Sequence, residues 1–309
     1  MDEMNMALAG SWLAASLRSA SPLMLVLLAE TLSQRIGLVN LGVEGQMLSG
    51  ACFGFGVAAY TQDPVTGLFA GALAGMVLSL LYGALCIHGR VNQIASGLCV
   101  MMLGAGITSY AGREFIGAEV TGLAPLAKNL VDVDSFWQPL LTQLTWSAPI
   151  AILLSICAGV FLYRTRSGMQ WRTVGESVDV ARALGIRPRI VQWQGLLVGG
   201  FLSGLGGAVL SIDYTQTWAP DMTKGLGLIA VGLVIVVRWN PYLVIPVALL
   251  FGLADTSVLR LQAAAFNTSS YLLAASPYVF CLVVLVITHL RVDRDGNMPA
   301  GLKGVFSDR

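Results

Sequence analysis

Side chains that could handle a polar solute or an ion lie within otherwise apolar stretches of this 309-residue chain. Four carboxylates lie in such stretches or at their ends: Glu30, Glu44, Asp213 and Asp255. An ionisable group inside an apolar span is costly, and it commonly marks a solute path or a proton relay. The residues that we expect to border a translocation path are Asn40, Glu44, Gln46, Asn92 and Gln93.

Two of these apolar stretches are too short to cross a bilayer alone. Eight uncharged residues separate Arg35 from Glu44, and thirteen separate Lys224 from Arg238, whereas a spanning helix needs about 20. Interrupted segments in the two halves of a transporter commonly form its central site. We therefore expect "GLVNLGVEG" and "KGLGLIAVG" to approach the path. For Glu44 two roles stay open: contact with the solute, or a structural role in which it pairs with Arg35 or caps a helix.

Signatures of catalysis and of nucleotide or metal binding are missing from the sequence. It contains no H-E-x-x-H, no G-x-S-x-G and no G-x-x-x-x-G-K-[ST], so it lacks the phosphate loop that cradles ATP. Five cysteines are scattered without C-x-x-C spacing, which indicates neither a metal site nor a disulfide framework. The net charge of +1 argues against a nucleic-acid surface. We expect no catalytic residue, no metal, no cofactor in this chain and no nucleic-acid partner.

The elements that must position the polar residues are membrane-spanning helices. The chain is 56% hydrophobic and 11% charged, whereas a soluble domain is about 25% charged. Its uncharged runs are apolar on all sides, unlike barrel strands, which alternate over about 10 residues. We expect an all-α integral membrane protein, a single polytopic domain over 1–309 with about nine or ten transmembrane helices. The expected spans are 20–34, 37–60, 65–87, 92–111, 148–163, 190–212, 225–238, 241–260 and 271–290.

Loop charges predict the orientation of these spans. The loop 164–189 holds six arginines but only Glu176 and Asp179 as acids, so the positive-inside rule makes it cytoplasmic. By parity the loop 113–147 is external and the tail 291–309 is cytoplasmic. The N-terminus lies outside if Trp12–Arg18 rests on the membrane surface, and inside if this segment helps to form a tenth span.

Within the cytoplasmic loop, Glu176–Leu184 is expected to form a short helix. Ser177 supplies a capping hydroxyl at its start, and Gly185 followed by Pro188 ends it. At about 1.5 Å per residue the helix would be about 14 Å long, too short to span a membrane. So short a helix is marginal in isolation, so we expect the membrane surface or a groove on a cytoplasmic partner to hold it.

The letters of this segment, "VGESVDVARALGI", resemble the coupling helix of permease subunits of ABC importers, in the branch of ribose, nucleoside and branched-chain amino acid permeases. The family pattern is close to "GENPxAARxxGI". Gly175, Glu176, Ala181 and Gly185 match it, while Ser177 and Val178 replace its Asn and Pro. "ETLSQRIGLVNLGVEGQMLSGA", "NQIASGLCVMML" and "GLGLIAVGLVIVVRWNPYLVIPVALLFG" are also similar to family segments, most closely to those of the nucleoside and simple-sugar subgroup.

This resemblance implies a division of labour between subunits. The chain would form the path for a nucleoside or a sugar such as ribose in the cell (inner) membrane, supplied by an extracytoplasmic solute-binding protein. A cytoplasmic ATPase would bind ATP, and a second permease subunit, the same chain or a related one, would complete the path. The residues implied to couple to the ATPase are Gly175, Glu176, Ser177, Ala181, Arg182 and Gly185. The alternative is an ion-coupled secondary transporter of a small polar solute, with Glu30, Glu44 and Asp213 as its ion-coupling residues.

Overall fold

The computed structural model describes residues 2–127, 136–263, 279, 281–284, 286 and 298–302. In this part of the chain the regular structure is helical, and the β pairings are isolated bridges such as Glu119 with Thr217. Six of the helices are long and apolar enough to cross a membrane. This confirms the expected all-α polytopic bundle.

The long helices account for most of the predicted spans. They are α1 (Asp2–Arg35), α3 (Pro64–Gly83), α4 (Gln93–Ala111), α6 (Ser147–Arg164), α9 (Pro188–Ala208) and α11 (Pro241–Ala263). Short π-helices, η1 (Ala84–His88) and η3 (Val209–Tyr214), extend α3 and α9. The remaining elements are α2 (Val43–Thr61), η2 (Gly112–Phe115), α5 (Trp137–Gln143), α7 (Arg166–Glu176), α8 (Val178–Ala183), α10 (Leu226–Val236) and η4 (Ala300–Leu302).

Three predicted spans differ from the structure or lie largely outside it. The span expected at 37–60 begins only at Val43, because residues 37–42 are not helical. The span expected at 225–238 is the 11-residue α10, about 16 Å long and too short to cross alone. Most of the span expected at 271–290 lies outside the described residues.

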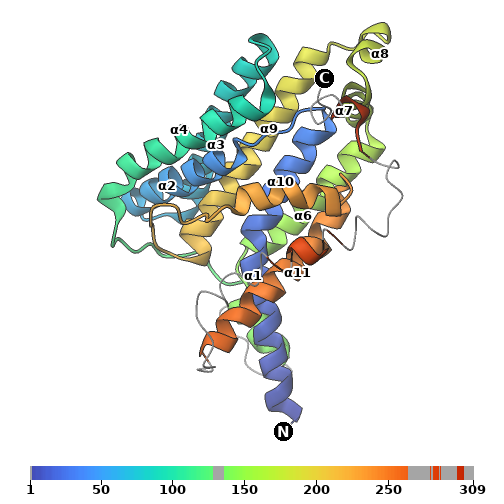
Figure 1. Ribbon diagram of the computed structural model, residues 1–309. Coiled ribbons are helices and arrows are strands. Elements are labelled where there is room, and N and C mark those ends of the chain that lie inside the picture. Colours follow the sequence, from blue (N-terminus) through green and yellow to red (C-terminus); the bar gives the residue numbers. More distant parts are fainter. Residues whose placement is uncertain are drawn as a thin grey trace.

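The N-terminal segment follows neither of the two expected arrangements. Trp12–Arg18 is neither a separate surface helix nor a tenth span, because it belongs to the single 34-residue helix α1. At 1.5 Å per residue such a helix is about 50 Å long, well beyond the roughly 30 Å of a hydrocarbon core. Its N-terminal end therefore lies at the end of the bundle opposite to Arg35, α7 and α8 (Figure 1).

Helices α2, α3 and α9 pack closely together, with α4 beside α2 and the long α1 running between α9 and α11 (Figure 1). Glycines set the approach of the first three helices. A Cβ atom placed on Gly75 of α3 would lie 2.5 Å from the carbonyl oxygen of Gly200 and 2.6 Å from Cα of Gly204, both on α9. A Cβ atom on Gly71 would lie 2.5 Å from the carbonyl oxygen of Gly50 on α2. Such small-residue faces allow backbones in lipid to touch directly.

We predict that Gly75→Ala lowers the stability of the bundle by about 1–3 kcal/mol, because the added methyl group meets backbone atoms that cannot move independently. The measurement is thermal unfolding of the detergent-solubilised protein. Gly106→Ala is the matched control, since Gly106 lies in α4 with no heavy atom within 4 Å of its ideal Cβ position. Equal melting temperatures for the two variants would contradict the close α3–α9 contact.

Candidate functional site

The first part of the candidate site is the non-helical segment 36–42, between α1 and α2. Its side chains Ile36, Leu38, Val39 and Asn40 are all at most 4% exposed. Buried backbone groups outside a helix need partners, because an unpaired N–H or C=O group loses its bond to water without replacement. The surrounding polar side chains supply several of these partners.

Three helices hold this segment by hydrogen bonds to its backbone. Glu30 of α1 accepts a hydrogen bond from the backbone N–H of Asn40 at 3.1 Å and another from the amide of Gln34 at 2.9 Å, both through Oε1. Gln93 of α4 accepts from the backbone N–H of Val39 at 3.0 Å. The hydroxyl of Tyr82 in α3 donates to the carbonyl oxygen of Val39 at 2.7 Å. Glu30 and Gln93 therefore act on the backbone of the segment.

Glu44 joins this segment to the second interrupted region. Its carboxylate accepts hydrogen bonds from the hydroxyl of Thr223 at 2.6 Å and from the backbone N–H groups of Gly225 at 2.9 Å and Gly227 at 2.6 Å. The last two lie at the start of α10, where unpaired N–H groups and the helix dipole favour an anion. Arg35 instead donates to the carbonyl oxygen of Trp239 at 2.7 Å. Of the two structural roles considered for Glu44, the structure shows capping of a helix and not pairing with Arg35.

A polar residue of the segment, Asn40, contacts Gln46 of α2. The amide of Asn40 donates to Oε1 of Gln46 at 3.1 Å, and the hydroxyl of Ser203 in α9 donates to the same oxygen at 3.0 Å. Oδ1 of Asn40 and Nε2 of Gln46 are buried and lack hydrogen-bond partners among the described residues. A buried polar atom without a partner costs about 1–3 kcal/mol. This pair therefore leaves two polar atoms unpaired inside the bundle.

Of the five expected path residues, Asn40 and Gln46 are hydrogen-bonded to each other, Gln93 binds the neighbouring backbone of Val39, and Glu44 binds the start of α10. The fifth, Asn92, is exposed and caps α4, where its Oδ1 accepts from the backbone N–H groups of Ile94 at 2.9 Å and Ala95 at 3.2 Å. A separate cavity of about 760 Å³ is lined by residues of α1, α3, α6, α7 and α9, mostly apolar, and contains none of the five. It offers few polar groups to a hydroxyl-bearing solute.

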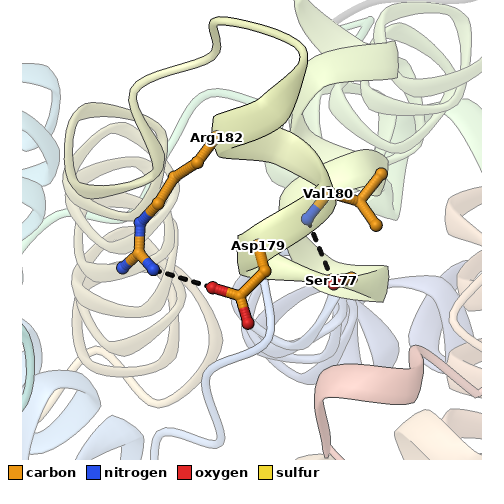
Figure 2. A network of polar contacts seen from close by, with 4 residues as sticks. All are labelled: Ser177, Asp179, Val180 and Arg182. Atoms are coloured by element: carbon orange, nitrogen blue, oxygen red, sulfur yellow. Dashed lines mark hydrogen bonds and ion pairs between the residues drawn. The ribbon is translucent and has the colours of Figure 1, made fainter.

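The second part of the site is α8, which projects from one end of the bundle (Figure 1). The expected helix Glu176–Leu184 is wrong at its start, because Gly175 and Glu176 end α7 and the chain is extended at Ser177, with φ of −156°. Ser177 is the cap that the sequence predicts, since its hydroxyl oxygen accepts from the backbone N–H of Val180 at 3.3 Å (Figure 2). The extended conformation of Ser177 interrupts the helix, so that α7 ends at Glu176 and α8 begins at Val178.

Gly185 ends α8 as expected, with φ of +76°. Its N–H donates to the carbonyl oxygen of Arg182, and the N–H of Ile186 donates to that of Ala181, each at 3.0 Å. This pair of bonds is the Schellman motif, in which glycine takes the left-handed position because it has no Cβ atom.

The exposed face of α8 is partly apolar. Val180 is 54% exposed and Leu184 is 67% exposed, whereas Ala181 is fully buried against the bundle. Arg182 pairs with Asp179 at 2.8 Å on the exposed side (Figure 2). Val180 and Leu184 were not among the predicted coupling residues, although their i, i+4 spacing in a polar loop is a signal that could have found them.

Close backbone contacts connect α7 to the non-helical segment. A Cβ atom on Gly175 would collide with the carbonyl oxygen of Arg35, and one on Gly37 would lie 3.6 Å from Cα of Gly175. Glu176 accepts a hydrogen bond from the backbone N–H of Ala300 at 3.0 Å. Glu176 therefore binds a segment of its own chain, a contact that no local sequence pattern indicates.

Comparison with known proteins agrees with this architecture. Residues 12–289 match the family described as the permease component of branched-chain amino acid transport systems. The chain belongs to this permease family. The match confirms the resemblance seen in the sequence, and it makes the chain a multi-pass membrane component of an ABC transporter. The family consists of transporter components and is not a recognised enzyme family.

Relatives of the permease carry sugar and nucleoside names. It is 35% identical to the putative glucose ABC transporter permease protein TsgC13 of Haloferax volcanii, over 83% of this chain and 79% of the relative. It is 30% identical to the guanosine ABC transporter permease protein NupQ of Bacillus subtilis, over 88% and 89%. The nucleoside ABC transporter permease protein NupC of Lactococcus lactis is 28% identical, over 87% and 89%. No solved structure matches the permease significantly.

We predict that Glu44→Ala destabilises the permease by about 3 kcal/mol, because three donors lose a buried, charged acceptor. Thermal unfolding in detergent measures this loss. Asp63→Ala removes a comparable cap at an exposed site, where the N–H groups of Thr66 and Val65 stabilise the carboxylate and lower the pKa of Asp63. We expect a much smaller loss there. Unchanged stability of Glu44→Ala together with a raised KM for uptake would instead assign Glu44 to the solute.

Proposed function

We propose that the permease forms the translocation path of an ATP-driven importer for a nucleoside or a simple sugar such as ribose. The names of its relatives, which specify glucose, guanosine and nucleosides, support this solute class. The unpaired amide atoms of Asn40 and Gln46 suit hydroxyl-bearing solutes, which donate and accept hydrogen bonds without carrying charge. The path passes this pair, and a second permease subunit, the same chain or a related one, completes it.

The observation that carries the proposed mechanism is the exposed apolar face of α8. Val180 and Leu184 enter a groove of a cytoplasmic ATPase, beside the Asp179–Arg182 pair. Gly175, Glu176, Ser177, Ala181 and Gly185 hold the helix in place rather than form the contact. ATP is bound by that ATPase, since this chain carries no phosphate-loop sequence.

Movement of α8 reaches the path through adjoining backbone contacts. Because Gly175 lies directly against the Arg35 carbonyl group, a shift of α7 displaces the end of α1 and the segment 36–42. Glu44 then transmits the shift to the start of α10 through its three hydrogen bonds. Closure of the ATPase dimer would in this way change which side of the membrane the path faces.

The arginine-rich end of the bundle is proposed to face the cytoplasm of a cell, in its (inner) membrane. Residues 298–302 lie at this end, where Ala300 contacts Glu176 of α7, and this supports a cytoplasmic C-terminus. The solute-binding protein docks at the opposite end, beside the start of α1.

The ion-coupled alternative is less well supported by the carboxylates that it requires. Glu44 accepts three hydrogen bonds. Asp213 accepts hydrogen bonds from the hydroxyl groups of Thr145 and Ser147, both at 2.6 Å. Glu30 accepts two bonds through Oε1. At Glu44 an ion would have to displace these partners, whereas Oε2 of Glu30 and Oδ1 of Asp213 have no hydrogen-bond partner among the described residues.

We predict that Val180→Asp combined with Leu184→Asp separates the permease from its ATPase, because two charges replace the apolar contact. Affinity purification from the native membrane in mild detergent, with mass spectrometry of the bound proteins, measures this. Ile116→Asp is the control, since Ile116 is 57% exposed beyond the far end of α4. Normal recovery of the ATPase with the double variant would contradict docking through α8.

Uptake should also depend on ATP and not on the proton gradient. We predict that an uncoupler leaves uptake of labelled guanosine or glucose unchanged when the internal ATP concentration is held constant. Vesicles with an internal ATP-regenerating system provide the measurement. Collapse of uptake together with the proton gradient would favour the secondary transporter.

A further inference from the structure

A basic hollow lies between the end of α8 and the start of α9. It has a volume of about 480 Å³ and is lined by Arg182, Ile186, Arg187, Pro188, Arg189 and Ile190. Three arginines and two isoleucines thus line one small hollow. The proposed coupling role does not account for this grouping.

Two of these arginines are free to bind an anion. Arg182 is paired with Asp179 at 2.8 Å. Arg187 and Arg189 are exposed and have no ion pair within the described part of the chain. The other acid of the loop, Glu176, contacts the backbone of Ala300 instead. The hollow therefore carries uncompensated positive charge.

The first turn of the 21-residue α9 adds to this field. Its N-cap residue, Arg187, makes no side-chain capping bond. The N-terminal end of a helix carries a partial positive charge that favours an anion. In α9 this comes from the helix dipole more than from free N–H groups, since Pro188 has no N–H and the N–H of Ile190 donates to the carbonyl oxygen of Arg187 at 3.1 Å. Side chains and backbone therefore attract the same kind of ligand.

The position of the hollow relative to the membrane indicates which anion it meets. Pro188 begins the membrane-spanning unit Pro188–Tyr214. Ile190 belongs to this unit and is 48% exposed. The hollow consequently lies at the start of a helix long and apolar enough to span a membrane, with Arg187 just before this helix and Arg189 and Ile190 in its first turn. Arginine binds phosphate through paired hydrogen bonds, and basic pockets at this depth suit lipid head groups.

We propose that this hollow binds the phosphate head group of an anionic phospholipid from the leaflet on the α8 side, held by Arg187 and Arg189. An acidic surface of the ATPase is a less suitable occupant, because Ile190 exposes an aliphatic side chain in the first turn of a helix apolar enough to span a membrane. The bound lipid fixes the junction of α8 and α9. The composition of this leaflet thereby sets how firmly the coupling helix is held.

The test uses the purified permease alone, so that it depends on neither the solute nor the ATPase. Native mass spectrometry measures binding of phosphatidylglycerol against phosphatidylcholine. We expect Arg187→Gln with Arg189→Gln to weaken phosphatidylglycerol binding by about fivefold for each arginine. Arg164→Gln with Arg166→Gln is the matched control. These two exposed arginines lie at the C-terminal end of α6 and at the start of α7, outside the hollow. We expect their replacement to change phosphatidylglycerol binding by less than about twofold.

Several results would overturn the proposal. Equal weakening in both double variants would show a general surface charge, and no preference for phosphatidylglycerol in the parent would show no site. Displacement of the lipid by equimolar inorganic phosphate would assign the hollow to a free anion. Unchanged lipid binding together with loss of the co-purifying ATPase would assign the arginines to the ATPase. Thermal unfolding checks that the variants are folded. If the double variant of Arg187 and Arg189 does not fold, Arg189→Gln alone takes its place.

Discussion

The structure depends on one constraint: backbone that leaves the helical conformation inside an apolar bundle must find its hydrogen-bond partners within the protein. Residues 36–42 meet it through Glu30, Gln93 and Tyr82, which come from three different helices. The start of α10 meets it through Glu44. Several of the costly buried polar groups therefore maintain two interruptions in the helices, and we expect shape changes of the bundle to occur at these interruptions.

Rigid packing surrounds these interruptions. In α2, α3 and α9 the glycines bring backbones into direct contact, as Gly75 does with Gly204. Helices in lipid associate through such packing because lipid tails are as apolar as the side chains. A displacement at one end of the bundle is consequently expected to move close-packed helices as units and to be absorbed at residues 36–42 and at the start of α10. This arrangement suits a protein that must alternate between two shapes.

The end that carries α8 contacts the rest of the chain at several points. Ser177 separates α8 from α7, while buried Ala181 and the Schellman turn at Gly185 hold α8 near α9. Gly175 lies against the end of α1, and Glu176 holds Ala300. The helix cap and the glycine stop thus give a short helix a fixed place, which its six residues could not secure in isolation.

The sequence by itself determined the fold class, six of the spans, the cap at Ser177 and the stop at Gly185, because hydropathy and capping are local properties. The sequence also indicated that the uncharged stretches 36–43 and 225–237 were too short to cross a bilayer alone. Only the tertiary structure decided that Glu44 caps α10, that Gln93 binds the backbone of Val39, and that Glu176 binds Ala300. These partners lie far apart along the chain or on different helices. Which donor fills a buried acceptor depends on how the helices pack, and no local pattern records that packing.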